Sequence, residues 1–273
     1  PDEYKPISNN NAYTNRMVAF ALNAAAEVGA AAGASVEECE RWRGLAGGLP
    51  IVRADDGVLV LQCEGFDRLA EPRFDRLWRD RRRPFAAQVS QERLYRSKCL
   101  KQADVLMMMA MFPDEFSDAE VRRAWEYYLP YTTHDSSLSA GVHAIVAARL
   151  GLADEAWEFW QRAKAIDLDI EHGGAAEGIH IANAGAVWQM AVFGFAGMRT
   201  AMQADVLTLA TRLPATWSRL AFPIVWKGAA AYVDIERGGV TVTNRGSRPL
   251  EVCVRRGLRT IRPGERALWK VGA

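Results

Sequence analysis

The sequence predicts a mainly α-helical protein that ends in a small antiparallel β-sheet. Alanine-rich and amphipathic stretches with helix-start signals occupy residues 12–195, and short β-rich runs bounded by turn residues occupy residues 220–271. The composition is that of an ordered globular chain, because 49% of the 273 residues are hydrophobic and 25% are charged. We place the division between a helical domain of residues 1–213 and a sheet domain of residues 214–273.

Helix signals begin near the start of the chain. Residues 12–32 are alanine-rich and carry only Arg16 and Glu27 as charged side chains, which is typical of a helix packed on most sides. Residues 35–38 and 117–120 both read S-x-x-E, the capping box in which a hydroxyl and a carboxylate satisfy free amides at a helix start. Further helices are expected at residues 103–111, 139–150, 153–166 and 184–195, with Gly151 as a stop signal.

One uncharged run needs a separate interpretation. Residues 178–198 contain no Asp, Glu, Lys or Arg and are long enough to span a bilayer. The run also holds His180, Asn183, Gln189 and four glycines, and its neighbours are amphipathic. We therefore expect a helix buried on all sides in a helical protein and no membrane insertion.

The sheet domain is predicted because the hydrophobic pattern changes beyond Pro214, from helical periodicity to short β-rich runs. Strands are expected at residues 220–226, 231–235, 240–243, 250–254 and 267–271. Turn signals separate several of them, at residues 238–239, 244–246 and 263–264. These runs together predict one antiparallel sheet.

Charge and cysteine usage exclude several classes of protein. The 34 basic and 33 acidic residues leave a net charge of +1, so we expect no nucleic-acid partner. Four cysteines lie at residues 39, 63, 99 and 253, a spacing that fits neither a zinc site nor a compact disulfide framework. No signal peptide is visible. We therefore predict free thiols, no metal and a cytoplasmic location.

Four polar islands interrupt the helical pattern, and each lies at or near the start of a helical segment. In a barrel of paired helices, loops at one end converge on one pocket, where helix N-termini favour anions. The islands are residues 1–4 with 9–15, residues 101–104, residues 132–139 and residues 172–180.

These islands resemble glycoside hydrolase family 65, the maltose, trehalose and kojibiose phosphorylases with their related hydrolases. The matching strings, in the family's order, are PDEY, NNAYTN, EGF, KQADV, THDSSLS, AEGIHIA and RLPATWSRLAF. The resemblance implies the second half of an (α/α)6 catalytic barrel followed by the C-terminal sheet. The missing N-terminal half is then a required partner, and the isolated fragment is expected to be inactive. Two departures are Lys5, where the family usually has histidine, and the atypical residues 6–8.

The resemblance also assigns candidate roles. Cleavage of an α-glucosidic bond with inversion needs an acid for the leaving oxygen and a nucleophile on the opposite face of the sugar. Glu3 would be the acid, with a pKa raised by burial. Lys101 and Gln102 would bind the glucose of a disaccharide. Inorganic phosphate would be the co-substrate, without a cofactor, held by Ser136, Ser137 and His180.

Alternatives remain open at this point. Phosphorolysis, which releases β-glucose 1-phosphate, is slightly favoured. In a hydrolase, Glu177 would instead act as the base that deprotonates water. A half-barrel could also be inactive, or an interaction module that needs a partner chain. Without the family resemblance, Glu3 would be interpreted as a solvated glutamate. The oligomeric state also stays open, and a homo-oligomer is possible. We expect His134, His143 and His172 to be structural.

Overall fold

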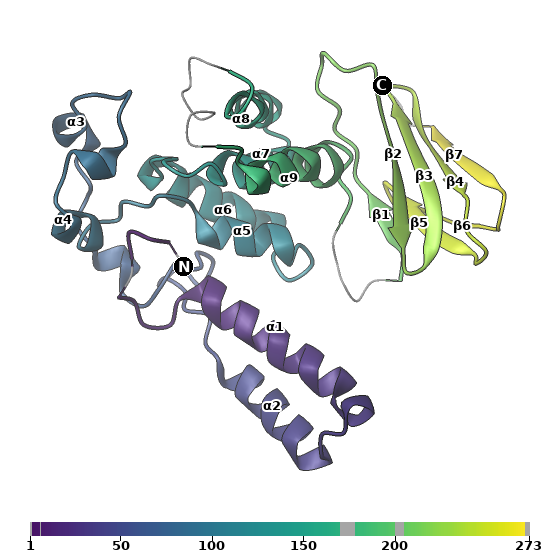
Figure 1. The fold of residues 1–273 in the computed structure, drawn as a ribbon, viewed down its shortest axis with the longest axis horizontal. Coiled ribbons are helices and arrows are strands. Elements are labelled where there is room, and N and C mark those ends of the chain that lie inside the picture. Colours follow the sequence, from purple (N-terminus) through teal and green to yellow (C-terminus); the bar gives the residue numbers. More distant parts are fainter. Residues whose placement is uncertain (1, 6, 170–177, 200–204, 271–273) are drawn as a thin grey trace. The chain divides into compact units, whose positions relative to one another are not determined.

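The computed structural model describes residues 2–5, 7–169, 178–199 and 205–270, and Figure 1 shows it as a ribbon. The chain forms two compact units. Unit 1 comprises Pro1–Ala110 and Phe116–Ser139, and unit 2 comprises Met111–Glu115 and Ala140–Ala273. Unit 1 is helical, whereas unit 2 combines helices with the C-terminal strands. The predicted fold class, mainly α with a β part at the C-terminus, is confirmed.

Unit 1 begins with two helices that lie side by side, α1 (Ala12–Val28) and α2 (Val36–Gly48) (Figure 1). Asn11 caps α1 by accepting a hydrogen bond from the amide of Thr14, and the predicted capping box at the start of α2 is present. The expectation that α1 is packed on most sides is wrong. Only Ala12 and Ala26 of this helix are buried, because α2 covers just one face of α1 and leaves the rest of its surface exposed.

The rest of unit 1 includes two helices with several buried residues, α5 (Asp104–Met111) and α6 (Asp118–Tyr128). The capping box predicted at Ser117 starts α6. Two short helices, α3 (Phe74–Leu77) and α4 (Gln91–Tyr95), lie in the irregular segment before α5. Tyr128 anchors this core, because its ring is fully buried and its hydroxyl donates to the carbonyl of Val60 at 2.8 Å.

The helices of unit 2 are α7 (Ser139–Leu150), α8 (Ala153–Ala165) and α9 (Ile181–Gln189), and α9 continues as a π-helix over Met190–Phe195. Gly151 ends α7 with a positive φ of 78°, as predicted. The prediction that residues 178–198 are buried on all sides is wrong. Ile181 and Trp188 are 79% and 51% exposed, since only part of the helix surface is covered. Among the described residues, no helix has the length and hydropathy of a membrane span.

The strands form two sheets instead of the single predicted one. In the four-stranded sheet, β2 (Arg219–Trp226), β3 (Ala229–Glu236), β4 (Gly239–Asn244) and β7 (Arg266–Lys270) pair antiparallel in the order β2-β3-β4-β7. In the three-stranded sheet, β5 (Leu250–Val254) pairs antiparallel with β6 (Gly257–Ile261) and parallel with β1 (Leu207–Leu209). Alternate residues of β3 are buried, and they join residues of β1 and β5 in one core. The sequence did not predict β1 or β6.

Candidate functional site

The first and second polar islands meet at a carboxylate that the sequence did not single out. Asp2 accepts hydrogen bonds from the backbone amides of Lys101 and Gln102, at 2.8 and 2.9 Å, through Oδ2. Its Oδ1 accepts from the amide of Tyr4 at 2.8 Å. One buried side chain therefore sets the position of both predicted motifs in unit 1.

This arrangement brings the predicted acid against the predicted sugar-binding lysine. The Nζ atom of Lys101 lies 2.5 Å from Oε2 of Glu3. The Glu3 side chain is 62% exposed, so the described residues do not supply the burial that was expected for the acid. Gln102 is also in place, and its Oε1 atom is buried without a hydrogen-bond partner among the described residues.

The third island joins the same unit through Tyr4. Its hydroxyl donates to Oδ2 of Asp135 at 2.9 Å, and this oxygen also accepts from the amide of Phe85 at 3.1 Å. Burial, and then the neighbouring Asp135, raise the pKa of Tyr4. Ser136 and Ser137 follow Asp135 in the turn before α7 and are half-buried. The contact between Tyr4 and Asp135 therefore ties the motif that carries Glu3 to the predicted phosphate-binding serines.

A second buried carboxylate accepts a hydrogen bond from the backbone of Asp2. Asp104, the first residue of α5, accepts through Oδ2 from the amide of Asp2 at 3.2 Å, from Asn11 Nδ2 at 3.1 Å and from Gln62 Nε2 at 3.2 Å. Burial raises the pKa of Asp104. Burial raises the pKa of Asp2 to about 6, and Asp104 adds to the shift. Two closely spaced carboxyl groups out of water therefore support the motif that carries Glu3.

Lys5 occupies the position where the resembled family usually has histidine. Its ammonium group is buried and donates to the carbonyl oxygens of Tyr4, Leu94 and Cys99, at 3.0, 2.7 and 2.7 Å. Burial lowers the pKa of Lys5. All three donors of the ammonium group are thus used by backbone carbonyls. Lys5 holds the chain that carries Glu3 to the segment that precedes Lys101.

The fourth island belongs to unit 2. His180 lies directly before α9, and both its backbone amide and its Nδ1 atom contact Oδ1 of Asp167, at 3.1 and 2.8 Å. Glu177, the predicted base of a hydrolase, lies outside the described residues. Among the described residues no group of three or more His, Cys, Asp and Glu side chains is arranged to hold a metal ion.

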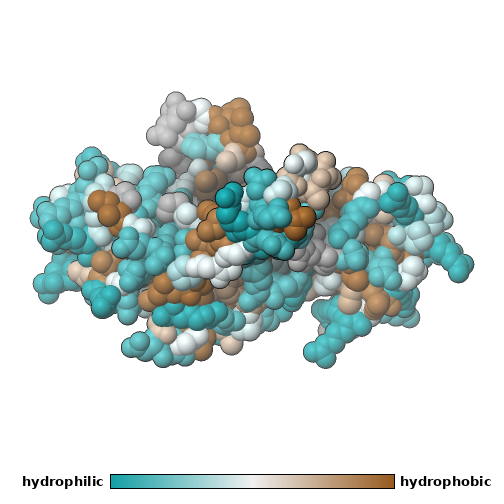
Figure 2. All heavy atoms as spheres, turned by 90° about the horizontal axis from the view of Figure 1, so that it is seen from below, coloured by the Kyte–Doolittle hydropathy of each residue, from teal (hydrophilic) through white to brown (hydrophobic). Residues whose placement is uncertain are grey.

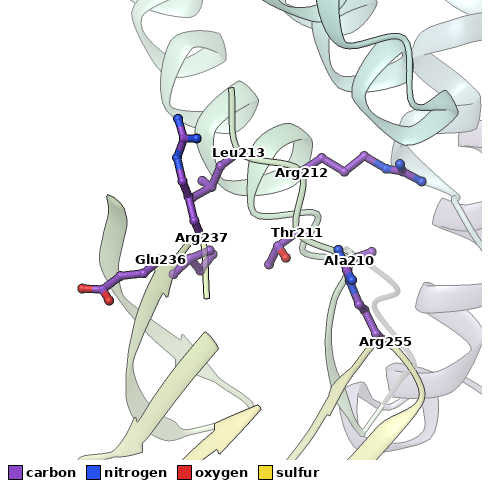
Figure 3. A pocket seen from close by; sticks show the side chains of 8 residues that line it. Ala210, Thr211, Arg212, Leu213, Glu236, Arg237 and Arg255 are labelled. Carbon is purple, nitrogen blue, oxygen red and sulfur yellow. The ribbon is translucent and has the colours of Figure 1, made fainter. Parts of the chain in front are cut away.

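A pocket of about 600 Å³ lies elsewhere in unit 2 and includes none of the predicted site residues. Figure 3 shows that its charged side chains do not converge, because Glu236 and Arg212 point away from Thr211 in opposite directions. Without convergent polar groups the hollow lacks the usual features of a substrate site. It is lined by Ala210, Thr211, Arg212, Leu213, Ile235, Glu236, Arg237 and Arg255.

Comparison with known proteins matches both parts of the chain to one family. Residues 1–189 match the glycosyl hydrolase family 65 central catalytic domain, and residues 198–257 match the family 65 C-terminal domain. A kojibiose phosphorylase from Escherichia coli K12 is 34% identical over 264 residues, 92% of this chain and 33% of that protein. A maltose phosphorylase from Bacillus subtilis 168 is 33% identical over 262 residues, 93% of this chain and 34% of that protein.

A solved structure gives the same relationship in three dimensions. It is provisionally named a kojibiose phosphorylase from human microbiome, and it matches with a TM-score of 0.86 and 27% sequence identity. The match covers 99% of this chain and 38% of that one. The chain thus spans about a third of the length of the curated relatives it matches.

Proposed function

Because the chain belongs to glycosyl hydrolase family 65, we propose that it forms part of the catalytic barrel, with the C-terminal sheet domain, of an enzyme that cleaves disaccharides with phosphate. The substrate would be an α-linked glucose disaccharide, and the relatives described above carry the names of kojibiose and maltose phosphorylases. The helical part would extend to residue 213, and the preceding half of the barrel would come from a longer protein. The four cysteines are free thiols, which supports a cytoplasmic location.

The observation that carries this proposal is the convergence of Glu3, Lys101 and Gln102 around Asp2. In the reaction, a phosphate oxygen attacks the anomeric carbon on the face opposite the glycosidic bond. Glu3 gives its proton to the leaving oxygen as that bond breaks, and the products are β-glucose 1-phosphate and the second sugar.

The ammonium group of Lys101 has three donors, so it can contact Glu3 and a sugar hydroxyl together. The Oε1 atom of Gln102, buried and without a partner among the described residues, adds an acceptor for a second hydroxyl. Lys101 and Gln102 would thus offer several donors and one acceptor to adjacent hydroxyls of the glucose.

The phosphate would be held by Ser136, Ser137 and His180. Hydroxyl donors, a protonated imidazole and helix N-terminal amides suit a dianion. Ser136 and Ser137 lie in the turn before α7, and His180 directly precedes α9. This assignment needs no cofactor.

The test measures products with and without phosphate in the full-length protein that carries these 273 residues. We expect α-glucoside cleavage only with inorganic phosphate, and the β-anomer of glucose 1-phosphate as the product. Glu3→Gln should lower turnover by a factor of about 100 or more, with sugar binding largely kept. The matched control is Glu37→Gln, an exposed glutamate in the first turn of α2, which should behave as wild type. Release of free glucose at full rate without phosphate would replace this proposal with hydrolysis.

A further inference from the structure

His180 is held by a single carboxylate oxygen in a way that fixes the direction of its ring. Oδ1 of Asp167 accepts both the backbone amide of His180 and its Nδ1–H, at 3.1 and 2.8 Å. The two side chains are 25% and 17% exposed, so the pair is largely shielded from solvent. Backbone and ring are thus anchored at one point, and the free edge of the imidazole carries Nε2.

The chemistry of the pair sets what Nε2 can do. A carboxylate only accepts hydrogen bonds, so Nδ1 must carry a proton. The hydrogen bond from His180 lowers the pKa of Asp167, which therefore remains charged at neutral pH. The carboxylate thereby fixes the tautomer and the orientation of the ring, and it leaves Nε2 as the ring nitrogen available to a ligand.

We infer that Asp167 is a positioning residue that orients the ring of His180, so that Nε2 can contact inorganic phosphate. The inference rests on the function proposed above, and it adds a residue that touches neither sugar nor phosphate. Asp167 lies in the turn after α8, thirteen positions before His180, and no motif in the sequence marks it.

The first experiment separates the two binding steps by steady-state kinetics in the full-length protein. Asp167→Asn keeps the shape and an acceptor oxygen but removes the charge. We expect the KM for phosphate to rise about tenfold, as for the loss of one charge-assisted hydrogen bond, while the KM for the disaccharide stays within about twofold. Asp154→Asn, an exposed carboxylate in the first turn of α8, is the matched control and should leave both values unchanged.

A double-mutant cycle distinguishes positioning from mere structural support. In a His180→Ala background, Asp167→Asn should have no further effect on the KM for phosphate, because its partner is gone. An equal effect in both backgrounds would overturn the inference. If Asp167→Asn fails to fold, Asp167→Glu and Asp167→Gln can be compared instead, because their side chains are equal in size and differ in charge. Only Asp167→Glu should then keep a low KM for phosphate.

The outcomes also separate this inference from the proposed function. A wild-type enzyme that needs phosphate, together with an Asp167→Asn variant of unchanged phosphate KM, overturns the role of Asp167 alone. A wild-type enzyme that cleaves at full rate without phosphate overturns both.

Discussion

At the scale of single residues, the buried carboxyl groups make the stability of unit 1 depend on pH. The pKa of Asp2 rises from its ordinary 3.8 to about 6 on folding. Between these values the folded chain binds more protons than the unfolded one, so the free energy of unfolding falls as pH rises through this range. The loss by pH 7 should reach about 3 kcal/mol at most.

Asp2→Asn tests this pH dependence. The amide cannot titrate, so denaturant unfolding at pH 4 and pH 7 should give a smaller difference in unfolding free energy than in the wild-type chain. Part of the dependence should remain, because the pKa of Asp104 is raised as well. Asp55→Asn, an exposed carboxyl, is the control. If Asp2→Asn keeps the full difference, Asp2 is not the group responsible.

The sequence identified some residues of the site and missed others for a physical reason. Glu3 and Lys101 stand in recognisable strings, and their contact in unit 1 agrees with a shared sugar site. Asp2 accepts hydrogen bonds from amides 99 and 100 positions along the chain, and a single sequence carries no signal of such a pairing. Gln62 and Asp167 likewise act through contacts that only the fold creates.

At the scale of elements, local chemistry determined what could be predicted. Both capping boxes and the end of α7 at Gly151 were predicted because each depends on residues within one turn. Strand β6 was missed because the β5–β6 turn is formed by Arg255 and Arg256, both with positive φ, where Asn-Gly would be the usual signal. Strand β1 is only three residues long, and its pairing with β5 is parallel and distant in sequence.

The close approach of α7 and α9 gives a prediction at this scale. A Cβ atom added to Gly141 would lie 2.7 Å from the Cβ of Ala186, so Gly141→Ala should destabilise the chain by about 1–3 kcal/mol. Adding Ala186→Gly should recover part of the loss. At Gly185 on α9 an added Cβ atom would meet open space, so Gly185→Ala should stabilise the chain by about 0.5–1 kcal/mol. Thermal unfolding checks all three, and a neutral Gly141→Ala would mean that the helices can move apart.

At the scale of the whole molecule, the helices expose large apolar side chains. Val28, Val36 and Leu45 on the α1–α2 hairpin are more than half exposed, and so are Ile181 and Trp188 on α9. On the face that Figure 2 presents, brown apolar patches lie among teal hydrophilic ones. If the chain supplies half of a barrel, as proposed above, side chains that face the other half would have no partner in this chain.

This explanation predicts that Ile181→Lys destabilises the full-length protein more than it destabilises the 273-residue chain. Ile181 is 79% exposed, so Ile181→Lys should change the unfolding free energy of the 273-residue chain by less than about 0.5 kcal/mol. In the full-length protein the same change should cost about 2 kcal/mol or more, because the preceding half of the barrel would bury the side chain. Val225→Lys, at a 72% exposed position on β2, should be neutral in both proteins and controls for the added charge. Denaturant unfolding of the four variants gives the comparison. If Ile181→Lys lowers the unfolding free energy equally little in both proteins, the preceding half of the barrel does not cover α9. If Ile181→Lys lowers the apparent mass of the 273-residue chain in solution, this face is instead a contact between copies of the chain.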